Sequence, residues 1–189
     1  MPTIASPHSP TTRTTSTRRD VPADTTSRAA ALAPYAWAVA RIAVGWLFLW
    51  AFVDKTFGLG RSTASADAWI DGGNPTKGYL SSATGPFDGL YHSIAGDPVV
   101  NVLFMAGLLG VGLTLMLGIG SRLGTIGGVL MLVLMWSSHL PVATNPFVDE
   151  HLIYSVVLVG LLLARADRTL GLGERWARVP AVQRWPWLR

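Results

Sequence analysis

Four long apolar stretches constrain this chain more than any other feature of its sequence. They cover residues 35–52, 98–119, 122–140 and 146–164. A helix needs about 20 predominantly apolar residues to cross the hydrocarbon core of a bilayer. Within lipid, a helix satisfies its backbone hydrogen bonds inside a single segment. The sequence therefore predicts an all-α fold in the form of a four-helix transmembrane bundle.

The composition fits one membrane domain. Of the 189 residues, 50% are hydrophobic and 14% are charged, and the length matches a single domain. The net charge is +4, but the basic residues flank the apolar stretches, so membrane lipid is a better partner than nucleic acid. The chain has no cysteine, which excludes disulfides, Fe–S clusters, cysteine-ligated zinc and the four-helix quinone reductases that need a cysteine pair.

Arginines mark one side of the predicted bundle. Most of them occur in the N-terminal tail, in the link between the second and third stretches and in the C-terminal tail: Arg13, Arg18, Arg19, Arg28, Arg122, Arg165, Arg168, Arg175, Arg178, Arg184 and Arg189. In the long loop after the first stretch, Lys55, Arg61 and Lys77 stand against Asp54, Asp67, Asp71, Asp88 and Asp97. The link between the third and fourth stretches has no Lys or Arg. The positive-inside rule therefore predicts a multi-pass plasma-membrane protein with both termini in the cytoplasm and a long outer loop between helices one and two.

Composition also divides the chain into three segments. Residues 1–30, rich in Ser, Thr, Pro and Ala, are predicted to be a disordered cytoplasmic tail. Residues 31–169 form the four-span domain, and residues 170–189 form a basic, Trp-rich tail on the inner membrane interface. Apolar residues between positions 87 and 94 recur at helical spacing, which predicts a short amphipathic helix in the outer loop.

Single residues in and beside the stretches predict how the helices pack and begin. Gly124 and Gly128 form a small-xxx-small pair, which lets a neighbouring helix approach closely. Arg41 is expected to extend its side chain to the lipid headgroups. Asn145 is predicted to cap the fourth helix, with Pro146 at the first helical position.

Polar residues near the outer helix ends are the candidates for chemistry, because polar groups at membrane depth are expensive. They are Asp54 and Lys55 on the first helix, His139 at the end of the third, and Asp149, Glu150, His151, Tyr154 and Ser155 on the fourth. His151, Tyr154 and Ser155 stand at positions i, i+3 and i+4, so they share one helix face. The short third link brings His139 towards the start of the fourth helix.

Three interpretations fit this polar cluster. In the first it is structural, since Asp149 and Glu150 lie where the helix dipole favours negative charge. In the second it binds a quinone, whose apolar ring and two carbonyl groups suit an aromatic mouth with His or Tyr donors. Quinone reduction also consumes protons, which His and Glu can supply. In the third, two histidines ligate haem, or one histidine and a carboxylate hold zinc. Because no ligand spacing marks a metal site, we expect no metal and no covalently bound cofactor.

Several segments of the chain resemble the DoxX/DoxD family of small four-helix membrane proteins, over about residues 35–175. The first helix, from Arg41 and Gly45 to Lys55, is similar to that family's opening, and the sequence Gly-Ile-Gly-Ser-Arg at 118–122 resembles its link between helices two and three. The segment Asn-Pro-Phe-Val-Asp-Glu-His-Leu-Ile-Tyr at 145–154, followed by Gly-Leu-Gly at 171–173, resembles the large membrane subunit of thiosulfate:quinone oxidoreductases.

The resemblance implies electron transfer from thiosulfate to a membrane quinone, giving tetrathionate, together with a companion redox subunit or a homo-oligomer. The alternative function is that of a non-catalytic membrane subunit or scaffold of a redox or oxidative-stress complex. A third possibility is a small-molecule carrier. The site assignment rests on the physical reasoning alone. The predicted catalytic residues are His151, Glu150 and Lys55. The predicted quinone- or substrate-binding residues are Asp54, Lys55, His139, Tyr154 and Ser155.

Overall fold

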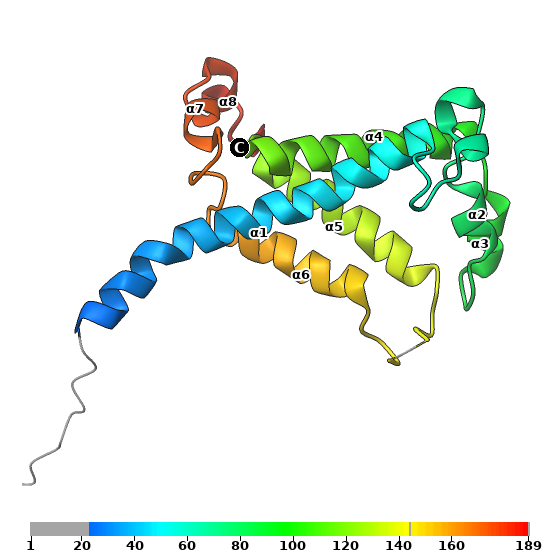
Figure 1. Cartoon of the computed structure of the whole chain (residues 1–189), viewed down its shortest axis with the longest axis horizontal. Helices are drawn as coiled ribbons and strands as arrows, with labels where there is room; N and C mark the ends of the chain where they lie inside the picture. Colours follow the sequence, from blue (N-terminus) through cyan, green and yellow to red (C-terminus); the bar gives the residue numbers. More distant parts are fainter. Residues whose placement is uncertain (1–22, 144, 189) are drawn as a thin grey trace, which may run out of the picture. The chain divides into compact units, whose positions relative to one another are not determined.

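A computed structural model describes residues 23–143 and 145–188, and within these ranges every regular element is a helix (Figure 1). The predicted all-α fold is therefore confirmed. The only ladder contact in the described part is an isolated bridge between Thr84 and His139. The chain divides into two units, 1–31 and 32–189. The described residues of the first unit, 23–31, belong to the start of the first helix.

Four long helices correspond to the four predicted stretches: α1 (Ala23–Phe57), α4 (Pro98–Leu117), α5 (Ser121–Ser137) and α6 (Glu150–Leu163). Between α1 and α4 lie η1 (Ser65–Asp67), η2 (Trp69–Asp71), α2 (Lys77–Ser81) and α3 (Asp88–Ser93). After α6 come α7 (Gly173–Ala177), α8 (Pro180–Arg184) and η3 (Pro186–Leu188). We call the end of the helices beside residues 58–97 the loop end, and the end beside residues 164–188 the tail end (Figure 1).

Two helical segments, Ser27–Phe57 and Pro98–Leu117, are long and apolar enough to cross a membrane. The other two long helices, α5 and α6, are also apolar but have 17 and 14 residues. Only 28% and 33% of the most apolar parts of the two longer segments are buried. A core helix of a soluble protein buries most of such a segment, so these helices present apolar side chains outwards.

Glycines set the distances between neighbouring helices. A Cβ atom at Gly45 of α1 would lie 2.9 Å from the backbone nitrogen of Met116, and one at Gly112 of α4 would lie 2.8 Å from that of Leu49. A Cβ atom at Gly124 would overlap the side chain of Thr114 on α4, and one at Gly128 would crowd Leu158 on α6. The packing role predicted for Gly124 and Gly128 is thus confirmed.

The expectation that Arg41 reaches the lipid headgroups is wrong. The side chain is 2% exposed and points into the tail end of the bundle. Its guanidinium donates hydrogen bonds to the carbonyl groups of Leu115 and Met116 on α4 and of Ala166 and Leu170 after α6. An arginine can serve several carbonyls at once because its planar group carries five N–H donors.

Arg41 thereby completes the hydrogen bonding at the end of α4. The last four carbonyls of a helix have no partner within it. Here the N–H groups of Gly118 and Ile119 bond to Thr114, and the N–H of Leu172 bonds to Leu117. The two carbonyls between them are those that accept from Arg41. A side chain on α1 therefore satisfies two of the last carbonyls of α4 and also holds the chain that follows α6.

The fourth long helix starts later than predicted. Its N-cap is Asp149, whose side chain accepts a hydrogen bond from the N–H of Leu152. Asn145 instead accepts from the N–H groups of Phe147 and Val148, so it closes a local turn four residues earlier. Asn and Asp both cap helices well. The Asn145 side chain is already used in an Asx turn, and Asp149 is therefore the residue that caps the helix.

Two further predictions are partly corrected. Residues 23–30, which we predicted to be disordered, form the first turns of α1, whereas residues 1–22 lie outside the described part of the chain. The predicted amphipathic helix in the long loop is present as α3, with Tyr91 buried and Phe87 and Leu90 exposed. Helix α3 has six residues and is shorter than the predicted helix, which the apolar residues between positions 87 and 94 indicated.

Candidate functional site

The loop end contains a large apolar cavity of about 660 Å³. Its walls come from the first half of α4, the second half of α5 and the helices of the long loop. The main apolar lining residues are Ile94, Val100, Leu103, Phe104, Leu130, Met131, Leu134 and Met135. Leu103 and Leu130 are also exposed on the outer surface of α4 and α5, so the cavity opens between these two helices. Its size and lining suit an apolar ligand.

A few polar side chains border this apolar space. Lys55, at the end of α1, lines the cavity and is half-buried. Within residues 23–143 and 145–188 its ammonium group makes no hydrogen bond or ion pair. Tyr91 also lines the cavity, but its hydroxyl is bonded to the Ser137 hydroxyl at 2.6 Å and donates to the Leu134 carbonyl at 3.0 Å. The ammonium group of Lys55 therefore lies at the edge of the cavity and can donate hydrogen bonds to a ligand.

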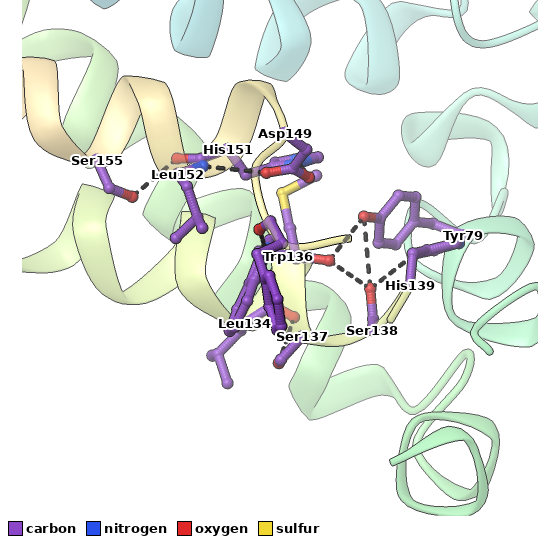
Figure 2. Close-up of polar contacts among 12 residues, drawn as sticks. Tyr79, Leu134, Trp136, Ser137, Ser138, His139, Asp149, His151, Leu152 and Ser155 are labelled. Atoms are coloured by element: carbon purple, nitrogen blue, oxygen red, sulfur yellow. Dashed lines mark hydrogen bonds and ion pairs between the residues drawn. The ribbon is translucent and has the colours of Figure 1, made fainter. Parts of the chain in front are cut away.

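A short hydrogen-bonded chain starts at the cavity wall, and Figure 2 shows its members Tyr79, Ser138 and His139. Tyr79 and Ser138 both line the cavity, and their hydroxyl groups are 3.4 Å apart. The Ser138 hydroxyl lies 2.9 Å from Nδ1 of His139, and Nε2 of His139 lies 3.5 Å from the hydroxyl of exposed Ser82. We call Tyr79, Ser138, His139 and Ser82 the polar chain.

Neighbouring backbone groups fix the polar chain in place. The hydroxyls of Tyr79 and Ser138 both donate to the carbonyl of Met135, at 3.1 and 2.7 Å. The Ser138 hydroxyl has one proton, which it can donate to the Met135 carbonyl or to the Tyr79 hydroxyl, and in either case Nδ1 of His139 can donate to the Ser138 oxygen. The His139 ring also packs on the Tyr79 ring, with centroids 4.7 Å apart.

The phenol of Tyr79 is held in its protonated form. Burial raises its pKa above the usual value, and the negative charges of Asp149 and Glu150 raise it further, whereas the hydrogen bond with Ser138 lowers it. Tyr79 therefore remains a hydrogen-bond donor at neutral pH.

At the start of α6, Asp149 is bonded to His151, with Oδ2 2.7 Å from Nδ1 (Figure 2). Burial alone would raise the pKa of Asp149, but hydrogen bonds from His151 and from the Leu152 N–H outweigh it and hold the pKa low. One carboxylate oxygen each of Asp149 and Glu150 and one ring nitrogen of His151 lie within 4.8 Å of one another, close enough to share a metal ion. The N-cap and the bond to His151 account for this arrangement without a metal ion.

The remaining predicted site residues lie elsewhere. Both carboxylate oxygens of buried Asp54 accept hydrogen bonds, from the N–H of Arg61 and from the N–H and hydroxyl of Ser62. Tyr154 packs against the core cluster. The hydroxyl of buried Ser155 donates to the carbonyl of His151 within the same helix. Asp54 therefore holds the loop after α1, and the hydroxyl of Ser155 has its hydrogen-bond partner within its own helix.

The structure thus separates the predicted site into parts. Lys55 borders the cavity, and His139 touches its wall through Ser138. His151 and Glu150 lie at the start of α6 and are not among the lining residues. Sequence reasoning missed Tyr79 and Ser138. The only available signal for Ser138 was its position beside His139, and Tyr79 stands in a loop segment with no periodic pattern.

Comparisons of this chain with protein-family descriptions, with curated proteins and with solved structures found no match. The resemblance to the DoxX/DoxD family therefore remains a prediction from the segments quoted above. The structure does bring three of those segments together, since the side chain of Arg41 lies beside both Gly118 and Gly171.

Proposed function

We propose that this chain is a four-helix membrane protein that binds a lipid-soluble quinone in the loop-end cavity. It would act as the quinone-facing subunit of an oxidoreductase in the plasma membrane. The observation that carries the proposal is the junction of a large apolar cavity with the polar chain. The cavity suits a ring with a hydrocarbon tail, and the polar chain suits the protons that quinone chemistry requires.

Exposed apolar side chains support the membrane placement. Leu103, Ile126, Val156 and Leu163 are between 65% and 78% exposed and come from α4, α5 and α6. Large apolar patches are rare on soluble monomers. In a bilayer these residues would face lipid, and the opening between α4 and α5 would admit a ligand from the lipid phase. With the tail end in the cytoplasm, the cavity lies in the outer half of the membrane.

The polar border supports a ligand with carbonyl groups. The ammonium of Lys55 would donate to a carbonyl oxygen and would stabilise negative charge that develops on it during reduction. Full reduction of the ring takes two electrons and two protons. Protons would enter from the surface at Ser82 and pass through His139 and Ser138 to the hydroxyl of Tyr79. Lys55 is the one predicted catalytic residue that borders the cavity.

Thiosulfate is the leading electron donor, on the resemblance alone. Two thiosulfate dianions would each lose one electron and join through a new S–S bond as tetrathionate, and the quinone would take up both electrons. Asp149 and Glu150 are acidic and would repel a dianion at the start of α6. We therefore place thiosulfate oxidation on a companion subunit and quinone reduction on this chain.

Quinone binding is tested with the purified protein in detergent and a ubiquinone or menaquinone analogue, by quenching of tryptophan fluorescence. Gly107→Leu places a side chain in the cavity, and we expect binding at least about tenfold weaker, which is about 1.4 kcal/mol. Gly110→Leu is the matched control, because Gly110 does not line the cavity and a Cβ atom there meets no neighbour within 4 Å. Equal binding by both variants would refute the assignment of the cavity.

The polar border is tested separately. Lys55→Met removes a charged donor, whose hydrogen bonds are worth about 1.5–3 kcal/mol, so we expect at least about tenfold weaker binding. The Tyr79 hydroxyl already donates to the Met135 carbonyl and would have to exchange that bond for one to the ligand, so Tyr79→Phe should have a smaller effect, about 0.5–1.5 kcal/mol. Binding that both variants leave unchanged would remove these residues from the site, even if the cavity assignment stands.

The role as an enzyme subunit is tested in membranes from cells with and without the gene. Thiosulfate and a quinone analogue are added, tetrathionate is measured, and co-purifying proteins are identified. Thiosulfate-dependent quinone reduction that requires Lys55 would support the oxidoreductase. A stable redox partner without that activity would favour the non-catalytic subunit. Uptake of a small molecule without either would favour the carrier.

A further inference from the structure

A second cavity, of about 410 Å³, lies at the tail end between the start of α5 and the chain that follows α6. Four arginines line it: Arg122, Arg165, Arg168 and Arg178. The two acidic lining residues are Asp167 and Glu174. The four positive and two negative charges leave a net charge of +2 on the lining. This cavity shares no lining residue with the loop-end cavity.

The arginines of this cavity have unused donors. Arg165, Arg168 and Arg178 are exposed, and within the described ranges their side chains form no hydrogen bond or ion pair. Arg122 uses one nitrogen, Nη1, which donates to the carbonyl of Pro186 at 3.0 Å. A guanidinium carries five N–H donors in a fork that matches phosphate geometry.

The acidic residues do not cancel this charge. Asp167 lies within electrostatic range of the buried Arg41, which is not among the lining residues. Glu174 is exposed and forms no ion pair with the cavity arginines. Four guanidinium groups therefore line one space with two carboxylates, which leaves positive charge in excess.

The start of α5 adds a second source of positive potential. Ser121 and Arg122 form the first turn of this 17-residue helix, and both line the cavity. The N-cap is Gly120, so no side chain caps the first N–H groups. The N-terminus of a helix attracts anions through these N–H groups and through the helix dipole.

We propose that the tail-end cavity binds a phosphate group, as the headgroup of an anionic phospholipid or as a soluble phosphate. The apolar surroundings favour the lipid: Leu162 lines the cavity, and the adjacent Leu163 is 78% exposed on α6. An acyl chain can lie along this surface while the headgroup enters the arginine cavity. The proposal is independent of quinone binding at the loop end.

The test is a titration of the purified full-length protein with phosphatidylglycerol and, in parallel, with phosphatidylcholine, followed by native mass spectrometry. We expect phosphatidylglycerol to bind at least about tenfold more tightly. Each arginine near anionic lipid contributes about 1 kcal/mol, so Arg168→Gln with Arg178→Gln should weaken phosphatidylglycerol binding about 30-fold. Melting temperature and monodispersity check that the variant is folded.

The control removes the same charge outside the cavity, with Arg175→Gln and Arg184→Gln. Both arginines are exposed and neither lines the cavity. We expect phosphatidylglycerol binding to fall less than about threefold in this control. Equal losses in the two double variants, or equal binding of the two lipids to the unaltered protein, would overturn the proposal. Inorganic phosphate that displaces the lipid would identify a soluble phosphate as the ligand, and failure to displace it would identify the lipid.

Discussion

Replacing Arg41 by methionine should destabilise the protein more than replacing any exposed arginine. Methionine fills much of the same space but donates no hydrogen bond. The substitution leaves buried carbonyls at the end of α4 and after α6 without the donor they have now. The helix C-terminus and the chain following α6 would be affected together, since one guanidinium serves both.

The size of this effect follows from the hydrogen bonds. A bond to a charged group contributes about 1.5–3 kcal/mol, but bonds that share one side chain are not additive. Removing one partner from a buried charged network typically costs about 3–5 kcal/mol. We expect a loss in that range, out of a total stability that is commonly about 5–15 kcal/mol. The stability of Arg41→Lys should lie between those of the unaltered protein and Arg41→Met, because an ammonium group has three donors and cannot reach both segments.

The assay is unfolding in mixed micelles by titration with SDS, followed through the fluorescence of the chain's eight tryptophans. Arg175→Met is the control, because Arg175 is exposed, and we expect a change below about 0.5 kcal/mol. Limited trypsin digestion gives a second readout, since release of residues 166–170 should speed cleavage after Arg168. A stability of Arg41→Met within about 0.5 kcal/mol of the control would refute the capping role.

Three further predictions follow from features of the bundle. Gly112→Ala should lower stability by about 1–3 kcal/mol because its Cβ meets the backbone of Leu49, whereas Gly110→Ala, with open space around it, should be neutral or stabilising in the same unfolding assay. A cysteine in place of Ser82 should react with an impermeant maleimide in intact cells and one in place of Arg175 should not; the opposite pattern would invert the proposed orientation. The low pKa of Asp149 stabilises the folded state above the pKa of the unfolded chain, about 3.9, and this contribution is lost as the pH falls through the lower folded value. The stability difference between the unaltered protein and Asp149→Ala should therefore shrink as the pH falls below about 4; a difference that is as large at pH 2 as at pH 5 would contradict this reasoning.

The helices could be predicted from sequence because their signal is local. Apolar length marked all four, and the glycine pair Gly124 and Gly128 marked close packing. The helix boundaries were harder to predict from sequence, because Asn145 and Asp149 are both good N-caps and only the turn after Asn145 decides between them. The sequence pattern alone ranks the two equally.

The cavity and the burial of Arg41 depend on partners far away in sequence. The carbonyls that Arg41 binds belong to backbone groups 74 to 129 positions away, and backbone carbonyls have no residue signature. The same holds for Tyr79, which meets Met135 and Ser138 across 56 and 59 positions. Clustering polar residues by depth selected Lys55, which borders the cavity, and His139, which contacts its wall through Ser138. It also selected Asp54 and Ser155, whose hydrogen bonds are satisfied locally.

The position of Arg41 also has a consequence for how the chain is made. In the membrane arrangement that we propose, α1 leaves the ribosome before α4 and α6, while the carbonyls that receive the Arg41 guanidinium belong to α4 and to residues after α6. A lone arginine within a span is costly in lipid. Helix α1 would therefore remain near the insertion machinery, or at the water interface, until residue 170 has emerged. Chains that end before this point would hold an unsatisfied charge, which gives membrane quality control a physical feature by which to recognise them.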